Sequence, residues 1–249
     1  MHCSGLAAGA QVPGFWHNLL DMSPDRPFQT RSRRAALLVG LLLGLCLRVA
    51  AQAPTVPTVT FNLAFPGSLP DKYTIVVPGD GSASYHSTGK MTADAESDDF
   101  RSDFPLSDST RTRVFDLAKR AHYFEGEIDS KKKGLAFTGE KTLSYRDAER
   151  DTKASYNYST IPAVQELTQL FQELSTTLEF GRRLDYYHRY QKLALDDELK
   201  RMEEMAQQNN LPELAAVAPI LQKLAQDRSV INPVRARAER LLERAGAGH

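Results

Sequence analysis

The spacing of apolar residues divides this chain into a strand-forming part and a helix-forming part. Apolar and polar side chains alternate at Val59, Phe61, Leu63 and Phe65, and a period of two is typical of a half-buried strand. After residue 160 the apolar residues recur every three or four positions, the period of a helix with one apolar face. The sequence therefore predicts an α+β protein with a helical C-terminal part.

Turn residues group the predicted strands into hairpins. Residues 71–77 and 82–88 flank a Pro-Gly-Asp-Gly turn, which predicts a first hairpin. Residues 135–145 and 152–158 flank a charged turn and predict a second, with Gly139 marking a bulge or a close approach of the backbone. A further short strand is expected at 100–106. We expect an antiparallel sheet of two hairpins with covering helices.

One helix is expected between the two hairpins. Ser107 is a favourable N-cap, and an apolar stripe at i, i+3, i+4 and i+7 follows it up to about His122. The stripe consists of Val114, Leu117, Ala118 and Ala121. We expect this face to pack on the sheet.

The C-terminal part is predicted to be entirely helical. Thr160 is expected to cap a helix with Pro162 in its first turn, and the apolar stripe continues past Gly181 to about Gln207. This segment is either one long helix or two helices joined near Gly181. Residues 213–226 predict a third helix kinked at Pro219, and residues 232–245 a last helix stopped by a glycine. Residues 182–245 should fold back as an antiparallel helical hairpin or small bundle.

The N-terminal region has the pattern of an export signal. Arg31, Arg33 and Arg34 precede an apolar run of about a dozen residues, and Ala51-Gln52-Ala53 fits a small-residue cleavage site. The pattern predicts cleavage after Ala53, so that Ala51 and Ala53 are the recognition residues and the protein is periplasmic or extracellular. The expected organisation is a removed segment 1–53, a sheet domain 54–180 and a helical tail 181–249.

Two other interpretations of this segment stay open. A retained membrane anchor would need roughly 20 apolar residues, and Arg48 ends the run earlier. A lipoprotein signal would use Cys46, but the bulky Leu45 precedes it where a small residue is favoured. Met22 would give an export signal a more ordinary start than Met1 does.

Charge and cysteine content narrow the classes of function. Removing residues 1–53 would take five arginines and two aspartates from 31 basic and 31 acidic residues, leaving 26 and 29. A net charge of −3 gives no electrostatic reason to expect nucleic acid as a partner. Both cysteines lie in the segment expected to be removed, which excludes a disulfide or thiolate chemistry in the remainder.

No catalytic motif is recognisable in the sequence. The histidines lack metal-ligand spacing. The acidic stretch 91–99 lacks the glycine and glutamate of a calcium loop and is predicted to be a solvated loop. Three consecutive lysines at 131–133 fit a solvated turn. His122 lies near Glu125 and Glu127, where an acid–base or metal role can be drawn, but a helix-end histidine beside an acidic loop is the favoured interpretation. We predict no catalytic residue, metal or cofactor.

One cluster has the composition of an interaction surface. Arg182, Tyr186 and Tyr190 are spaced i, i+4 and i+8 on one helix face, with Arg189 beside them. Arg and Tyr are enriched at interaction hot spots. We predict partner-binding residues here, while solvated arginines and tyrosines covering a helix junction remain the alternative.

Residues 70–171 resemble exported bacterial domains of unassigned function. The resemblance rests on the Tyr73–Val77 strand, a Gly-Asp-Gly turn, a helix, and the stretch Gly134–Gly139 before a second hairpin. It covers less than half of the chain and transfers no functional residue. The sequence favours a non-enzymatic envelope or periplasmic scaffold or protein-interaction module. The alternative is a hydrolase or small-ligand binder whose site combines dispersed residues, around His122 or under the second hairpin.

Overall fold

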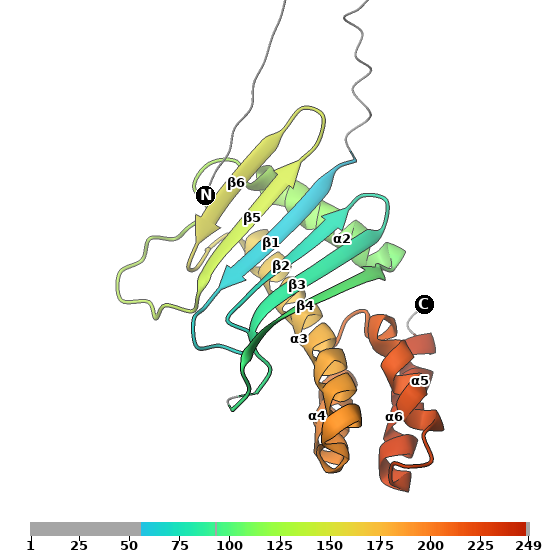
Figure 1. Ribbon diagram of the computed structural model, residues 1–249. Helices are drawn as coiled ribbons and strands as arrows, with labels where there is room; N and C mark the ends of the chain where they lie inside the picture. Colours follow the sequence, from blue (N-terminus) through green and yellow to red (C-terminus); the bar gives the residue numbers. More distant parts are fainter. Residues whose placement is uncertain (1–55, 93, 248–249) are drawn as a thin grey trace, which may run out of the picture. The chain divides into compact units, whose positions relative to one another are not determined.

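The computed structural model describes residues 56–92 and 94–247, which form a six-stranded antiparallel sheet with helices on one face and a helical C-terminal part (Figure 1). The predicted α+β class is confirmed. The export signal with Ala51 and Ala53 lies outside the described residues. Across the described ranges, no helix is both long and apolar enough to cross a membrane.

The first strand lies at the centre of the sheet, between the two predicted hairpins. The strand order in the sheet is β4-β3-β2-β1-β5-β6, and all neighbouring strands are antiparallel. The strands are β1 (Thr58–Ala64), β2 (Lys72–Pro78), β3 (Ser82–Lys90), β4 (Ser97–Pro105), β5 (Glu140–Arg146) and β6 (Asp151–Tyr156).

The inward-facing residues of the central strands form the core of the sheet. Phe61 of β1 lies opposite Ile75 of β2 and Leu143 of β5, and all three are fully buried. The Phe61 ring stacks on Phe171 of a covering helix, with ring centroids 5.1 Å apart. This stacking places that helix on the inner face, as the alternating pattern predicts.

Five helices and three short 3-10 turns make up the rest of the described chain. The helices are α2 (Asp108–Arg120), α3 (Pro162–Tyr190), α4 (Leu195–Gln207), α5 (Ala218–Gln226) and α6 (Asn232–Ala247). The 3-10 turns are η1 (His122–Phe124), η2 (Lys192–Ala194) and η3 (Leu214–Val217). The predicted cap of α2 is confirmed, because the Thr110 amide donates to the Ser107 hydroxyl over 3.2 Å.

Helix α3 contributes to two hydrophobic clusters. The first combines the sheet with α2 and the N-terminal half of α3 as far as Leu178. The second begins at Phe180 and contains the apolar faces of α4, α5 and α6. The predicted stripe residues Leu195, Leu199 and Met202 are completely buried there. The helices after α3 therefore fold back on one another, as expected.

Several predicted boundaries around the second hairpin are wrong. β5 begins at Glu140 rather than near residue 135, and Leu135 and Phe137 are exposed. Gly139 adopts φ +95°, and a Cβ there would lie 2.8 Å from the Phe65 Cβ. The backbone therefore turns at this close approach and joins the sheet only afterwards. The returning strand was expected to run to Tyr158, but β6 ends at Tyr156 and Tyr158 is exposed beyond it.

The predicted ends of the helices also need correction. Thr160 does not cap α3; Ile161 occupies the N-cap, without a side-chain bond. The helix is continuous through Gly181 and ends at Gln191, whose φ of −145° breaks it well before Gln207. Pro219 lies in the first turn of α5, which begins at Ala218, instead of kinking a longer helix, because proline fits a first turn. Gly246 lies within α6 and does not stop it.

The acidic stretch before β4 was predicted to be a loop as far as Asp99. Instead β4 starts at Ser97, where Ser97 pairs with Lys90 and Asp98 with Gly89 of β3. The length of β3 supplies a ladder for these residues, which local composition alone does not reveal. Asp98 and Asp99 therefore lie on an edge strand of the sheet, whereas Asp94 and Glu96 precede it.

Candidate protein-interaction groove

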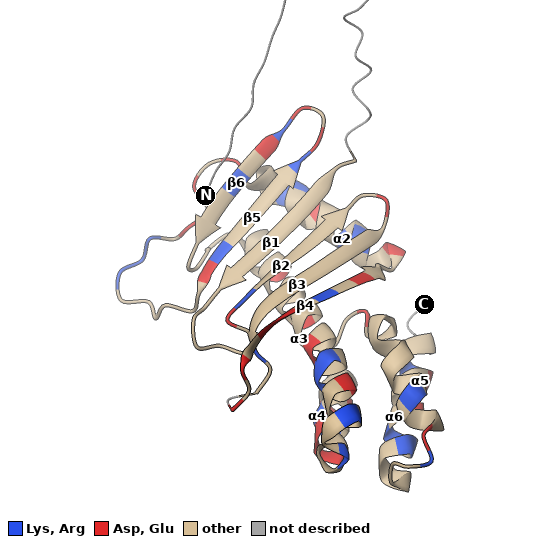
Figure 2. Cartoon of the chain, viewed as in Figure 1, with Lys and Arg blue, Asp and Glu red and all other residues tan. Residues whose placement is uncertain are grey.

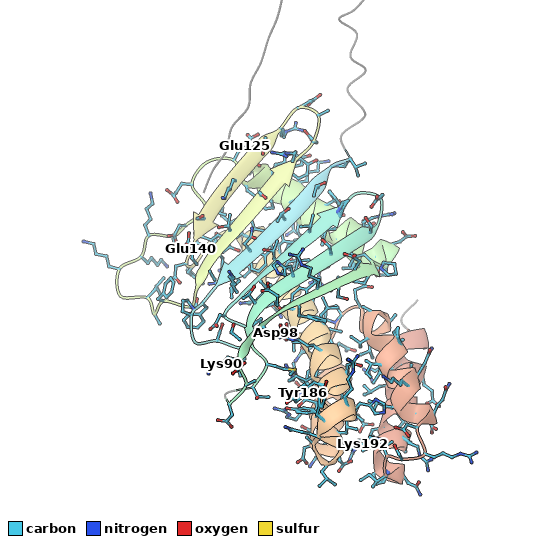
Figure 3. The ribbon with its side chains drawn as sticks, viewed as in Figure 1. Lys90, Asp98, Glu125, Glu140, Tyr186 and Lys192 are labelled. Atoms are coloured by element: carbon cyan, nitrogen blue, oxygen red, sulfur yellow. The ribbon has the colours of Figure 1, made fainter. Side chains whose placement is uncertain are left out.

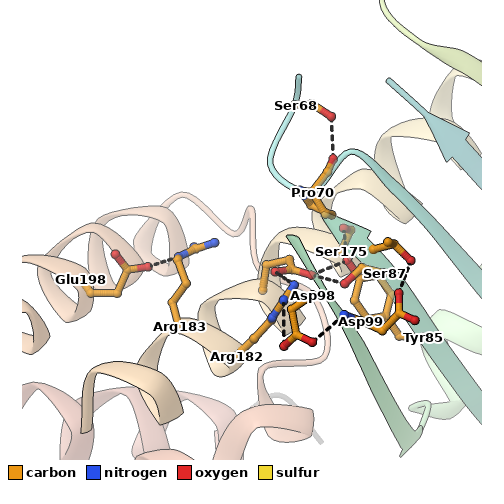
Figure 4. A network of polar contacts seen from close by, with 12 residues as sticks. Ser68, Pro70, Tyr85, Ser87, Asp98, Asp99, Ser175, Arg182, Arg183 and Glu198 are labelled. Atoms are coloured by element: carbon orange, nitrogen blue, oxygen red, sulfur yellow. Dashed lines mark hydrogen bonds and ion pairs between the residues drawn. The ribbon is translucent and has the colours of Figure 1, made fainter. Parts of the chain in front are cut away.

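A buried carboxylate joins α3 to β3. Glu179 is 4% exposed, and its Oε1 accepts hydrogen bonds from the hydroxyls of Tyr85 (2.8 Å) and Ser87 (2.7 Å). The Tyr85 hydroxyl also lies 2.9 Å from that of Ser175, one turn earlier on α3 (Figure 4). Burial, and then the charge of Glu179, raise the pKa of Tyr85, so the phenol remains a donor. This network fixes α3 to the sheet near the end of the first hydrophobic cluster.

Arg182 is held between two carboxylates just after this network. Its Nη1 lies 3.5 Å from Oε2 of Glu179 and its Nη2 lies 3.7 Å from Oδ2 of Asp98 on β4. The guanidinium carbon is 5.4 Å from the ring centroid of Phe100, within cation–π range. Nη1 makes no hydrogen bond within the described residues. The side chain is only 8% exposed, so Arg182 is more buried than the sequence predicts.

The other three predicted partner-binding residues lie further along the same helix. Tyr190 is 70% exposed, and its ring centroid is 5.1 Å from that of the half-buried Tyr186. Arg189 is exposed and forms an ion pair with Asp185 over 2.5 Å. Tyr186 also packs on the second hydrophobic cluster. The structure therefore brings all four predicted residues onto one stretch of α3, with Tyr190 the most accessible.

These side chains border a groove between α3 and the start of β4. Its volume is about 330 Å³. Figure 3 shows Asp98 at the start of β4 and Tyr186 on α3. The lining residues are Met91, Asp98, Phe100, Gly181, Arg182, Asp185, Tyr186, Arg189 and Tyr190.

A second, smaller hollow of about 150 Å³ continues the groove toward η3 and α5. Phe100 and Gly181 line both hollows, while Ile220 and Pro219 line only the second. Gly181 permits this arrangement because a Cβ there would lie 2.6 Å from Cγ1 of Val217. The groove thus runs along the inner side of β4, past α3 and toward α5.

A second buried carboxylate holds the C-terminal half of α3 against α4. Glu198 is 1% exposed and accepts from Nε of Arg183 over 2.6 Å, and it also pairs with Arg201. The Arg183 guanidinium lies 4.7 Å from the ring centroid of Phe180. Helix α3 is therefore anchored by buried carboxylates on both sides of Gly181, by Glu179 before it and by Glu198, through Arg183, after it.

His188, near the end of α3, joins the turn after α5. Its Nε2 is 2.7 Å from Oδ2 of Asp227, which Lys192 also contacts. Hydrogen bonds, first from Ser229 and then from His188, hold the pKa of Asp227 well below its usual range. Nδ1 of His188 is buried and has no hydrogen-bond partner among the described residues. The pair braces the C-terminal end of α3.

The alternative acid–base group predicted from the sequence is open to solvent. His122, Glu125 and Glu127 are all exposed, and Glu127 pairs with Lys131. No group of three His, Cys, Asp or Glu residues able to hold a metal ion occurs in residues 56–92 and 94–247. The structure does not enclose these side chains in a cleft.

The sequence did not reveal a buried lysine under the second hairpin. Lys141 is 5% exposed, and its Nζ donates to the carbonyls of Thr138, Gly139 and Asn157 and to the Thr138 hydroxyl, over 2.9–3.2 Å. Burial lowers the pKa of this amine. It borders a cavity of about 480 Å³ that Tyr156, Tyr158 and glutamines of α3 also line. These four acceptors indicate a structural role: the ammonium links the loop before β5 to the end of the second hairpin.

Comparison with known proteins adds no assignment to these sites: no protein-family model matches the chain, and no curated protein is significantly similar to it.

Proposed function

We propose that this chain is an exported, non-enzymatic scaffold or protein-interaction module that meets its partner through the groove between α3 and β4. The observation that carries the proposal is the exposed aromatic side chain of Tyr190, 70% accessible beside Tyr186 on a helix anchored by buried charges. Tyrosine supplies a large contact area at a small cost in conformational entropy.

The surroundings of Tyr190 fit an interface better than a catalytic centre. The groove combines apolar and aromatic walls with charges that are already paired, such as Arg189 with Asp185. An aromatic anchor beside paired polar groups is the arrangement found at binding hot spots. The buried Glu179 and Glu198 hold the helix in place and so reduce the ordering cost of association.

Export is proposed on the sequence alone. Three arginines, an apolar run and the Ala51-Gln52-Ala53 motif support a cleaved signal and a periplasmic or extracellular location, in a bacterial envelope. Mass spectrometry of the protein isolated from its native cells should find an N-terminus near Pro54. A protein that retains Ala35–Leu47 would contradict cleavage and favour a membrane anchor.

Site-specific photo-crosslinking tests the interaction surface. A photoreactive amino acid replaces Tyr190 in one variant and Leu193 in another; Leu193 is 92% exposed and lies outside the groove lining, so it is a matched control. We expect one discrete protein adduct in producing cells from position 190 and none from position 193. Equal adducts from both positions, or none from position 190, would refute the proposed surface.

The cavity beside Lys141 favours a second candidate function, the binding of a small polar ligand. A buried amine and several amide and hydroxyl groups line about 480 Å³. Thermal-shift screening of small polar metabolites would test it, with Gln169→Ala as the cavity variant. A ligand whose stabilising effect is lost in that variant would support this function; a screen without any such ligand would exclude it.

A further inference from the structure

The outer side of β4 is an unpaired edge of the sheet. In the strand order β4 has only β3 as a neighbour. Within the described chain, residues 97–105 make no backbone hydrogen bond to any segment other than β3. A nine-residue strand therefore leaves alternate amides and carbonyls free along one edge. Such an edge is a template for another extended chain.

The proposed groove lies on the inner side of this same edge. Asp98, Phe100 and Ser102 alternate along β4; Asp98 lines the first hollow, Ser102 the second, and Phe100 both. A strand added beside β4 would point every second side chain in the same direction, toward α3 and α5. The residues of β4 that line the hollows thus repeat with the two-residue period of an extended peptide.

The negative charge along β4 favours a peptide with basic side chains. Residues 94–105 carry five carboxylates and a single guanidinium, that of Arg101 (Figure 2). Asp94, Glu96 and Asp103 form no ion pair with another described residue. A lysine- or arginine-rich segment would neutralise these carboxylates.

Arg182 adds a donor at the groove wall. Its guanidinium is more than nine-tenths buried, and Nη1 makes no hydrogen bond within the described residues although it lies 3.5 Å from Glu179.

We propose that β4 binds an extended, basic peptide segment of a partner protein as a seventh strand, with alternate apolar side chains in the two hollows of the groove. This inference rests on the proposed function and names the class of partner. Main-chain hydrogen bonds to β4 would supply affinity, and the groove and the carboxylates would supply specificity.

Short peptides of defined pattern test this binding directly. A fluorescent peptide of alternating lysine and valine is titrated into the protein, beside an alternating glutamate–valine peptide of the same length. We expect saturable binding of the basic peptide alone, weakened by added salt. Equal binding of the acidic peptide, or no binding of the basic one, would overturn the proposal.

Backbone methylation separates strand addition from charge attraction. One peptide carries N-methyl groups on all its valines and another on all its lysines, so that each blocks a different edge of the strand. Strand addition requires that one methylated peptide loses binding while the other retains it. If both bind as tightly as the parent peptide, the backbone plays no part and the proposal fails.

Charge reversal locates the peptide on β4. The double variant Glu96→Lys/Asp103→Lys should bind the basic peptide about tenfold more weakly or worse, since two surface charges change sign. Glu125→Lys changes an exposed charge away from β4 and should leave the affinity unchanged. Equal loss in both proteins would contradict binding at the edge.

Three further outcomes have distinct meanings. A dimer in sedimentation experiments that becomes monomeric in the double variant would assign the edge to a second copy and overturn the peptide proposal. An adduct from position 190 without any binding of the basic peptide would leave the proposed function standing and remove only the strand-addition mechanism. Absence of any adduct from position 190 would contradict the proposed function itself.

Discussion

The close contact at Gly181 yields a prediction whose sign opposes the usual rule for helices. Replacing glycine by alanine within an exposed helix normally stabilises it by about 1 kcal/mol. At Gly181 the added Cβ would lie 2.6 Å from Cγ1 of Val217, where about 3.5–4.0 Å is the ordinary separation of carbon atoms. Overpacking of this kind costs about 1–3 kcal/mol. We expect Gly181→Ala to lower the free energy of unfolding by about 1 kcal/mol, since the overlap outweighs the gain in propensity.

Urea unfolding followed by circular dichroism measures this change, provided that the slope with denaturant stays constant. Val217→Ala removes the overlapping methyl groups and leaves a partly empty site. Combining it with Gly181→Ala should yield a protein more stable than the sum of the two single effects predicts, by about 0.5–3 kcal/mol of coupling. Gly246→Ala in α6 is the matched control, because nothing lies within 4 Å of its added Cβ.

Two results are expected together. Gly246→Ala should be neutral or slightly stabilising, and Gly181→Ala should be destabilising in the wild-type background alone. A stabilised Gly181→Ala protein would show that η3 moves away from α3 at little cost. The two hydrophobic clusters would then be less firmly joined than the structure indicates.

Three further predictions concern the polar anchors. Tyr85→Phe removes a donor from the buried Glu179 carboxylate and should lower the free energy of unfolding by about 1–3 kcal/mol in urea titrations; an unchanged value would mean that water replaces the hydroxyl. Ser107→Ala removes the α2 cap and also the hydroxyl that donates a hydrogen bond to Glu213 over 2.6 Å. It should lower the free energy of unfolding by about 1–2 kcal/mol in the same assay. A loss of only a few tenths would show that the cap is dispensable. Arginines of α6 lower the pKa of Glu203, first through the hydrogen bond from Arg240. The ionised carboxylate therefore stabilises the folded protein fully above the ordinary glutamate pKa of about 4.3. This contribution to the free energy of unfolding is lost as the pH falls through the lowered pKa. Stability measured from pH 6 to pH 3 should therefore fall less steeply in Glu203→Gln, and parallel curves for both proteins would contradict this role.

Local patterns in the sequence were sufficient to predict the sheet and its main covering helices. Alternation at Val59, Phe61 and Leu63 gives a strand with one buried face, and all three are buried on the helix-covered side. The stripe beginning at Val114 likewise faces the core, and Ser107 caps its helix. These features depend on neighbours in sequence, so a period or a single capping residue reveals them.

Features that depend on distant partners were missed. The start of β4 at Ser97 is set by the length of β3, and the burial of Arg182 is set by Asp98 and Phe100, some eighty residues earlier. Glu179 was not recognised from the sequence, where the only sign is a charged residue within the apolar spacing of α3. Ser175 at i−4 on the same helix face was a usable sign that a polar network meets the sheet there.

The continuity of α3 explains why these distant features meet in one place. Its 29 residues span about 43 Å, enough to cross from the sheet cluster into the helical cluster without a break. A break at Gly181 would let the two clusters move independently and would change the distance between β4 and the tyrosines. Buried carboxylates at Glu179 and Glu198 anchor the helix on both sides of that glycine. The groove therefore exists because glycine allows close packing where the helix passes from one cluster to the next.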